Sequence, residues 1–221
     1  VEWAIGAIGV ILFLTGLHMS LVWPLSGPTA FDNIVFGEPV LALGVMLIAG
    51  SYLLGSRKFW PASSSAADPD ANEIGRESWS HLAKLLQPLS WFGAAMGLGL
   101  VAIAFVGPFY TPWEAPPQEP ISGEFADVEW LENTFISLLY LITAIGALVL
   151  PFALMRRTLN EAVSRLKVVG VCWAIAGAIF VGFGAMNYYT HVGLTINTYE
   201  ESTQAEAEFE TMPEAEGTMP E

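Results

Sequence analysis

The chain has 221 residues, of which 53% are hydrophobic and 14% are charged, and its mean hydropathy is +0.51. Because about a quarter of the residues of an ordinary soluble domain are charged, this composition excludes such a domain and indicates an integral membrane protein. The formal net charge is -14, so the chain repels nucleic acids and other polyanions, and we expect no nucleic-acid partner.

Five apolar stretches approach or exceed the length of about 20 residues that a helix needs to cross a bilayer. They cover residues 3–23, 39–54, 88–109, 133–155 and 168–189. The second is short, and a locally thinner bilayer would accommodate it. The first has no Lys or Arg before it, so we interpret it as a span and not as a signal peptide. The sequence therefore predicts an all-α fold, a polytopic five-helix bundle over residues 1–199.

The basic residues predict the orientation of this bundle. All eight Lys and Arg lie in two connectors between the apolar stretches: Arg57, Lys58, Arg76, Lys84, Arg156, Arg157, Arg165 and Lys167. Loops rich in Lys and Arg stay in the cytoplasm during insertion. We therefore expect a multi-pass protein of the plasma membrane with its N-terminus inside and its C-terminus outside.

Three segments outside the spans have distinct compositions. Residues 73–87 are amphipathic and are expected to form a short helix in the inner interface. Residues 110–131 contain four prolines and predict an ordered cap over the outer end, with Trp113 and Trp130 at headgroup level. Residues 200–221 are rich in Glu, Ala and Thr and are expected to be a disordered acidic tail.

Acidic residues gather on the predicted outer side, which has no Lys or Arg: Asp32, Glu38, Glu114, Glu119, Glu124, Asp127, Glu129 and Glu132. Among them, Glu38 and Glu132 begin the second and fourth spans. His18 lies inside the first span, close to its outer end, and His191 follows the fifth span at the same level, with Asn187 one helical turn below it. Four helix ends thus bring two imidazoles and two carboxylates to a common depth.

Two histidines and two carboxylates suit a divalent transition metal such as Zn, Cu, Fe or Mn. We therefore predict an outer metal site formed by His18, Glu38, Glu132 and His191. Its reaction is left open, a metal-dependent oxidoreductase being one option.

Two alternatives use the same residues. In the first, the glutamates cap helices and His18 makes an interhelical hydrogen bond, in a non-enzymatic membrane scaffold or assembly subunit. In the second, His18 and His191 are the axial ligands of a b-type haem. Haem ranks lower, because the outer side offers no Arg or Lys to its propionates.

Small residues in the third and fifth spans predict close helix packing and a homo-oligomer. The other expected partners are membrane lipid and a cation or small apolar ligand at the outer face.

Two sequence runs carry a resemblance to a known family. They are HMSLVWPLSGP over residues 18–28 and NIVFGEP over residues 33–39. Through them the chain resembles a prokaryotic membrane family named domain of unknown function 981. The resemblance implies a similar number of spans and brings no assigned reaction.

Overall fold

The computed structural model describes residues 2–27, 30–56 and 71–211, and every regular element within them is helical. The helices are α1 (Glu2–Val22), α2 (Asp32–Val35), α3 (Gly37–Gly55), α4 (Ala71–Tyr110), η3 (Ser122–Phe125), α5 (Glu129–Leu154) and α6 (Leu159–Thr211). Five segments are long and apolar enough to cross a membrane: α1, α2 with α3, α4, α5 and α6. The predicted all-α class and the number of such helices are therefore confirmed.

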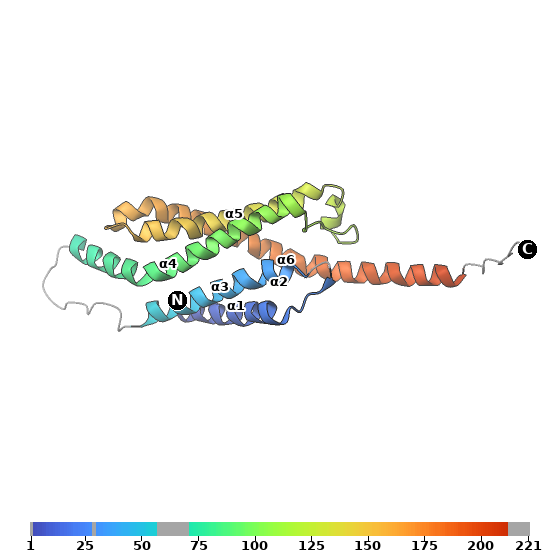
Figure 1. Cartoon of the computed structure of the whole chain (residues 1–221), viewed down its shortest axis with the longest axis horizontal. Coiled ribbons are helices and arrows are strands. Elements are labelled where there is room, and N and C mark those ends of the chain that lie inside the picture. Colours follow the sequence, from blue (N-terminus) through green and yellow to red (C-terminus); the bar gives the residue numbers. More distant parts are fainter. Residues whose placement is uncertain (1, 28–29, 57–70, 212–221) are drawn as a thin grey trace, which may run out of the picture.

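The helices form an elongated bundle built from two antiparallel pairs (Figure 1). Helix α1 packs along α3, and α4 packs along α5, while α6 covers α5. The two pairs join mainly where α3 meets α4. Helix α6 then continues beyond the bundle toward the C-terminus (Figure 1).

Glycines let α1 and α3 pack backbone to backbone. Gly9 and Gly16 on α1 face α3, and Gly37 and Gly44 on α3 face α1, so each helix contributes two glycines seven residues apart. A side chain at Gly16 would meet the backbone of Leu41, and one at Gly44 would meet the backbone of Phe13. A seven-residue repeat keeps one seam of a helix facing its partner. This glycine seam holds the first pair together at close range.

The corner of the first pair is inserted into the core of the second. Val35 of α2 is buried among side chains of α4 and α5, and its carbonyl accepts a hydrogen bond of 3.0 Å from the hydroxyl of Tyr140. Trp113 stacks on Tyr140 with ring centroids 6.2 Å apart. Trp113 was expected at headgroup level, but it is 7% exposed, because the loop after α4 folds back onto the core. Trp130 is 65% exposed on the surface of the bundle, and its predicted position at headgroup level stays a prediction.

The segment expected to be a separate interfacial helix is instead the first part of α4. The helix runs through Pro88, and Figure 1 shows that α4 is bent in its first half. Trp79 is buried against the turn between α5 and α6, where its indole N–H donates 3.0 Å to the carbonyl of Arg156. Burial of Trp79 therefore ties the first part of α4 to the turn between α5 and α6.

Helix α6 extends to Thr211, so the expected disordered tail is helical over residues 200–211. The rest of that tail, residues 212–221, lies outside the described residues. Glu, Ala and Gln favour helix, and two hydrogen bonds anchor the extension. Asn197 donates 2.7 Å to the carbonyl of Gln118, and the Gln118 amide donates 2.9 Å to Glu201.

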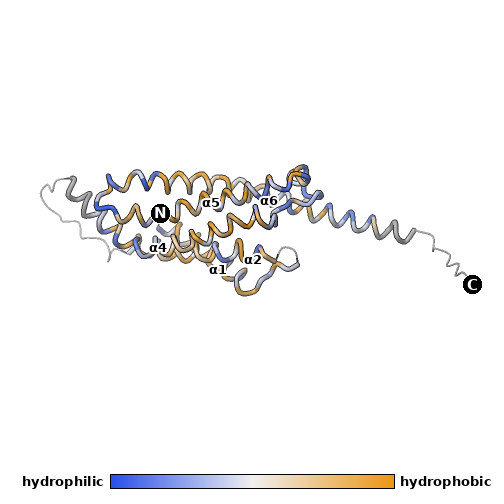
Figure 2. The backbone as a smooth tube through the Cα atoms, turned by 45° about the horizontal axis from the view of Figure 1, so that its top comes forward, coloured by the Kyte–Doolittle hydropathy of each residue, from blue (hydrophilic) through white to orange (hydrophobic). Residues whose placement is uncertain are grey.

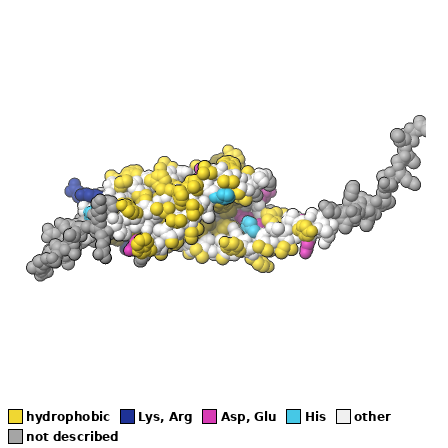
Figure 3. Space-filling view, turned by 90° about the horizontal axis from the view of Figure 1, so that it is seen from below, with side chains coloured by type: hydrophobic (Ala, Val, Ile, Leu, Met, Phe, Trp, Pro, Cys, Tyr) yellow, Lys and Arg dark blue, Asp and Glu magenta, His cyan; other side chains and the backbone are white. Residues whose placement is uncertain are grey.

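The two ends of the bundle differ in charge. We call the end with α2, residues 111–128 and the start of α5 the acidic end, and the end with Arg156 and Arg157 the basic end. Hydrophobic residues run along the bundle between them, and hydrophilic residues gather at both ends and along the protruding part of α6 (Figure 2). Figure 3 shows the visible Lys and Arg at one end only.

Candidate functional site

Two buried asparagines organise the acidic end. Asn33 is fully buried, and its side-chain amide donates to the carbonyls of Leu25 and Ala30 at 2.8 and 2.9 Å. Asn133 is 1% exposed; its Oδ1 accepts the backbone N–H of Trp113 at 3.1 Å and its Nδ2 donates to the carbonyl of Glu129 at 2.7 Å. Each asparagine thus fixes one of the two loops that close this end of the bundle.

Glu119 is the most buried carboxylate of the loop between α4 and α5. It is 8% exposed, and its Oε1 lies 3.6 Å from Nδ1 of His191 on α6. The imidazole is largely exposed, and the hydroxyl of Thr190 lies 3.3 Å from the same nitrogen. Glu119 and His191 therefore form a contact between the loop and α6 that is open on the histidine side.

Two further carboxylates lie near this contact. Asp32, the first residue of α2, interacts electrostatically with His191, and its Oδ1 is buried with no hydrogen-bond partner within the described ranges. Glu132, in the first turn of α5, is half-buried and interacts with Glu119. The backbone of Ala115 also interacts with its carboxyl group and favours the ionised form. We call these four residues the acid–histidine cluster: Asp32, Glu119, Glu132 and His191. They come from four parts of the chain.

The cluster contains two of the four predicted metal ligands, Glu132 and His191. The other two, His18 on α1 and Glu38 in the first turn of α3, have exposed side chains. In the part of the chain that the structure describes, no group of three or more His, Cys, Asp or Glu side chains is arranged to hold a metal ion. The predicted set of four is therefore not assembled around one point, and its role in metal binding stays a prediction.

The sequence analysis counted Asp32 and Glu119 among the outer acids but did not single them out. Glu119 follows two consecutive prolines, Pro116 and Pro117, and its backbone N–H bonds to the carbonyl of Pro116 at 2.9 Å. A tight turn of this kind explains how a carboxylate in a short loop is directed inward. The proline pair is the signal that could have identified it.

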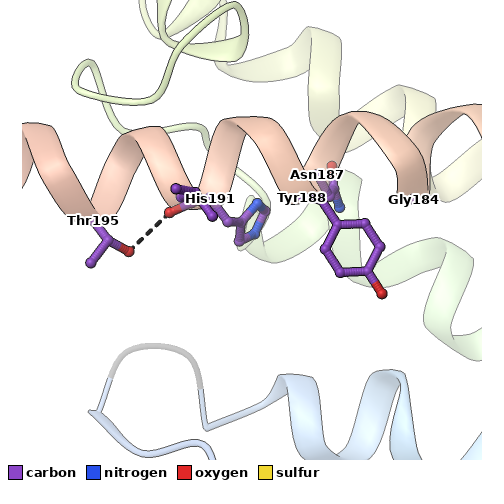
Figure 4. A pocket seen from close by; sticks show the side chains of 6 residues that line it. Gly184, Asn187, Tyr188, His191 and Thr195 are labelled. Carbon is purple, nitrogen blue, oxygen red and sulfur yellow. Dashed lines mark hydrogen bonds between the residues drawn. The ribbon is translucent and has the colours of Figure 1, made fainter.

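A groove lies beside His191 along one face of α6 (Figure 4). Its volume is about 540 Å³, and Asn187, Tyr188, His191 and Thr195 line it together with Gly184 and Val192. Asn187 and His191 share this face, as predicted from their spacing. The imidazole therefore reaches both the groove and Glu119.

Comparison with known proteins gives one match. The model of the family described as "Protein of unknown function (DUF981)" matches residues 2–193, which include all of α1 to α5 and α6 as far as the acid–histidine cluster. Searches of curated proteins and of solved structures find no match. The match extends the resemblance seen at residues 18–39 over most of the chain. This chain therefore belongs to the DUF981 family.

Proposed function

We propose that this protein is a multi-pass protein of the plasma membrane with its acidic end outside the cell. Five helices of crossing length and the many exposed apolar side chains along them support insertion into lipid. The orientation rests on the Lys and Arg residues, all of which lie between residues 57 and 84 or between 156 and 167.

Cysteine labelling of intact cells tests the orientation. Cys172 is the only cysteine, so a Cys172→Ala background lets single cysteines report their side of the membrane. Ser202, on the exposed extension of α6, and Ser164, exposed at the basic end, form a matched pair. A membrane-impermeant maleimide should label the Ser202→Cys variant in intact cells and the Ser164→Cys variant only after permeabilisation. The reverse pattern would refute the orientation.

We further propose that the acid–histidine cluster binds a divalent transition metal. The observation that carries this proposal is the Glu119–His191 contact with Asp32 and Glu132 beside it. One imidazole with carboxylate oxygens suits Zn, Mn or Fe. A bound cation would offset the repulsion between the carboxylates. The chain has no Lys or Arg between residues 85 and 155 that could offset this repulsion instead.

The chemistry of such a site depends on its open positions. A metal with a free coordination position supports redox or hydrolytic reactions, whereas a fully ligated one is structural. The exposed side of His191 and the adjoining groove leave room for water or a substrate at the cluster. An accessible metal site on the outer side of the membrane is therefore the function we propose.

Elemental analysis of the purified full-length chain, with a visible spectrum, tests this site. We expect His191→Ala and Glu119→Gln to lower metal affinity by about tenfold or more, because each removes a ligand. Glu114→Gln, which changes an exposed carboxylate of the same loop, should bind metal normally.

The predicted ligands outside the cluster are tested in the same experiment. If His18→Ala and Glu38→Gln lower metal content as strongly as His191→Ala, the site includes α1 and α3, as the sequence predicts. A Soret band would indicate haem instead. Full metal content in folded His191→Ala and Glu119→Gln proteins, or no metal in any preparation, would contradict the proposal and favour a non-enzymatic scaffold.

A further inference from the structure

A second cavity at the acidic end lies between the loop after α4, the start of α5 and α6. Its volume is about 240 Å³, and most of its lining is apolar, from Ile121, Phe125, Leu131, Phe135, Phe183 and Met186. Since ligand sites for drug-sized molecules usually exceed about 300 Å³, this cavity suits a smaller molecule. Asp32, Glu119 and His191 do not line it, so it is distinct from the acid–histidine cluster except for Glu132.

Aromatic rings form one corner of the cavity. Phe135 and Phe183 have centroids 5.6 Å apart and planes inclined at 58°. Phe135 is 37% exposed and Phe125 is 52% exposed, so neighbouring side chains do not cover these rings completely. The faces of aromatic rings carry partial negative charge and attract cations, and quaternary ammonium ions bind in aromatic cages for this reason.

Carboxyl groups add negative charge to the cavity. Glu114, Glu129 and Glu132 all line the cavity. The negative charge of these carboxyl groups repels anions. A neutral apolar molecule could bind but would leave this charge uncompensated. Phenylalanine rings do not ligate metal ions, so a hydrated metal ion gains nothing from the aromatic corner. An organic ammonium ion uses both the rings and the carboxylates.

We propose that this cavity binds a small organic ammonium ion, with its charge near Glu132 and its methyl or methylene groups against Phe135 and Phe183. Such an ion needs few hydrogen bonds, which fits a lining with Ser122 as its one hydroxyl group. The ion is either a free solute or the headgroup of a lipid, because both can present the same ammonium group at the acidic end.

Choline and its uncharged carbon isostere 3,3-dimethyl-1-butanol are the probes, titrated by calorimetry against the full chain in a maltoside detergent. Choline should bind more tightly than the isostere. Phe135→Leu and Phe183→Leu keep apolar bulk but remove the ring, so each should weaken choline binding by about three- to tenfold and leave the isostere unchanged. Glu132→Gln should also weaken choline alone. Phe152→Leu, at an exposed phenylalanine near the basic end, is the matched control and should bind choline normally.

Bilayers of defined composition distinguish the two sources of the ion. If the ligand is a lipid headgroup, choline should bind in phosphatidylglycerol nanodiscs and bind more weakly in phosphatidylcholine nanodiscs; if it is a free solute, both should give the same affinity. Equal binding of choline and its isostere, equal losses for both probes in the Phe→Leu variants, or no binding of choline would overturn the proposal. These outcomes are independent of the metal content of His191→Ala, so the two proposals can fail separately.

Discussion

Replacing Gly16 by alanine should destabilise the protein by about 3 kcal/mol, at the upper end of the usual cost of overpacking. The new Cβ would meet the backbone nitrogen of Leu41, and a backbone cannot turn aside as a side chain can. Helices α1 and α3 would have to move apart along their whole contact, because Gly44 approaches Phe13 equally closely in the same seam. Thermal unfolding of the purified protein in detergent measures the loss.

The same substitution at Gly99 provides the control. Gly99 lies in α4 with open space where its Cβ would stand, so Gly99→Ala should leave stability unchanged or raise it by up to about 1 kcal/mol through helix propensity. Opposite effects of the same substitution at these two glycines would show that the close packing at the glycine seam, and not the loss of glycine as such, causes the drop in stability at Gly16. Equal melting temperatures for the Gly16→Ala and Gly99→Ala proteins would show that α1 and α3 are not packed so closely.

The number of helices of crossing length and the positions of their apolar stretches could be predicted because they depend on local composition. A run of about 20 apolar residues is long enough to cross a bilayer whatever surrounds it. The glycine seam could have been found as well, since the glycines at 9 and 16 and at 37 and 44 repeat at seven residues. Which helices pair was harder to predict, because it depends on contacts between segments far apart in sequence.

Helix ends were the least predictable part of the fold. The sequence analysis separated a helix over residues 73–87 from a span that begins at residue 88, yet α4 is continuous there. Trp79 and Ala83 are buried against Leu154 and Ala162 near the turn between α5 and α6. Likewise, the composition of residues 200–211 predicts disorder in isolation, and contacts of Asn197 and Glu201 with the loop after α4 favour helix. In both places tertiary contacts, and not the local helix propensity of the sequence, determine where the helix ends.

The candidate site was predicted in part for a related reason. His191 and Glu132 were identified because they fall at helix ends on one side of the predicted membrane. Glu119 was not distinguished from the other acids of its loop, since its burial depends on how the loop folds over α6 and only the preceding proline pair marks it in the sequence. A common depth brings helix ends to the same level but does not fix their separation within the membrane plane, so the sequence did not determine which of the four predicted ligands lie together.

The sequence analysis singled out Glu38 and Glu132 at the starts of the second and fourth spans, whereas the structure shows that Asn33 and Asn133 play similar roles near these two places. Glu38 and Glu132 each lie in the first turn of a helix, where a carboxylate is favourable. Asn33 and Asn133 instead hold the chain that precedes those helices. A buried side-chain amide can donate one hydrogen bond and accept another, whereas an ionised carboxylate can only accept. Each of these two loops folds back on its own helix and needs a donor as well as an acceptor.

Replacing Asn133 by leucine should therefore have a second large effect, about 2 to 4 kcal/mol of lost stability. Leucine fits the volume but satisfies neither partner, so the N–H of Trp113 and the carbonyl of Glu129 would lose the side chain that pairs them. The loop that carries Glu119 would detach from α5, and cleavage by a Glu-specific protease at residues 114–124 should increase sharply.

Asn160→Leu, the same change at an exposed position near the start of α6, should alter neither melting nor cleavage in this loop. The Asn133→Leu protein also tests how the acidic end is assembled. Because Glu119 reaches His191 only while the loop is docked, metal binding at the cluster should weaken together with loop protection, although every proposed ligand is still present. A protected loop and normal melting in Asn133→Leu would mean that Trp113 stacking on Tyr140 is sufficient to hold the loop without the asparagine.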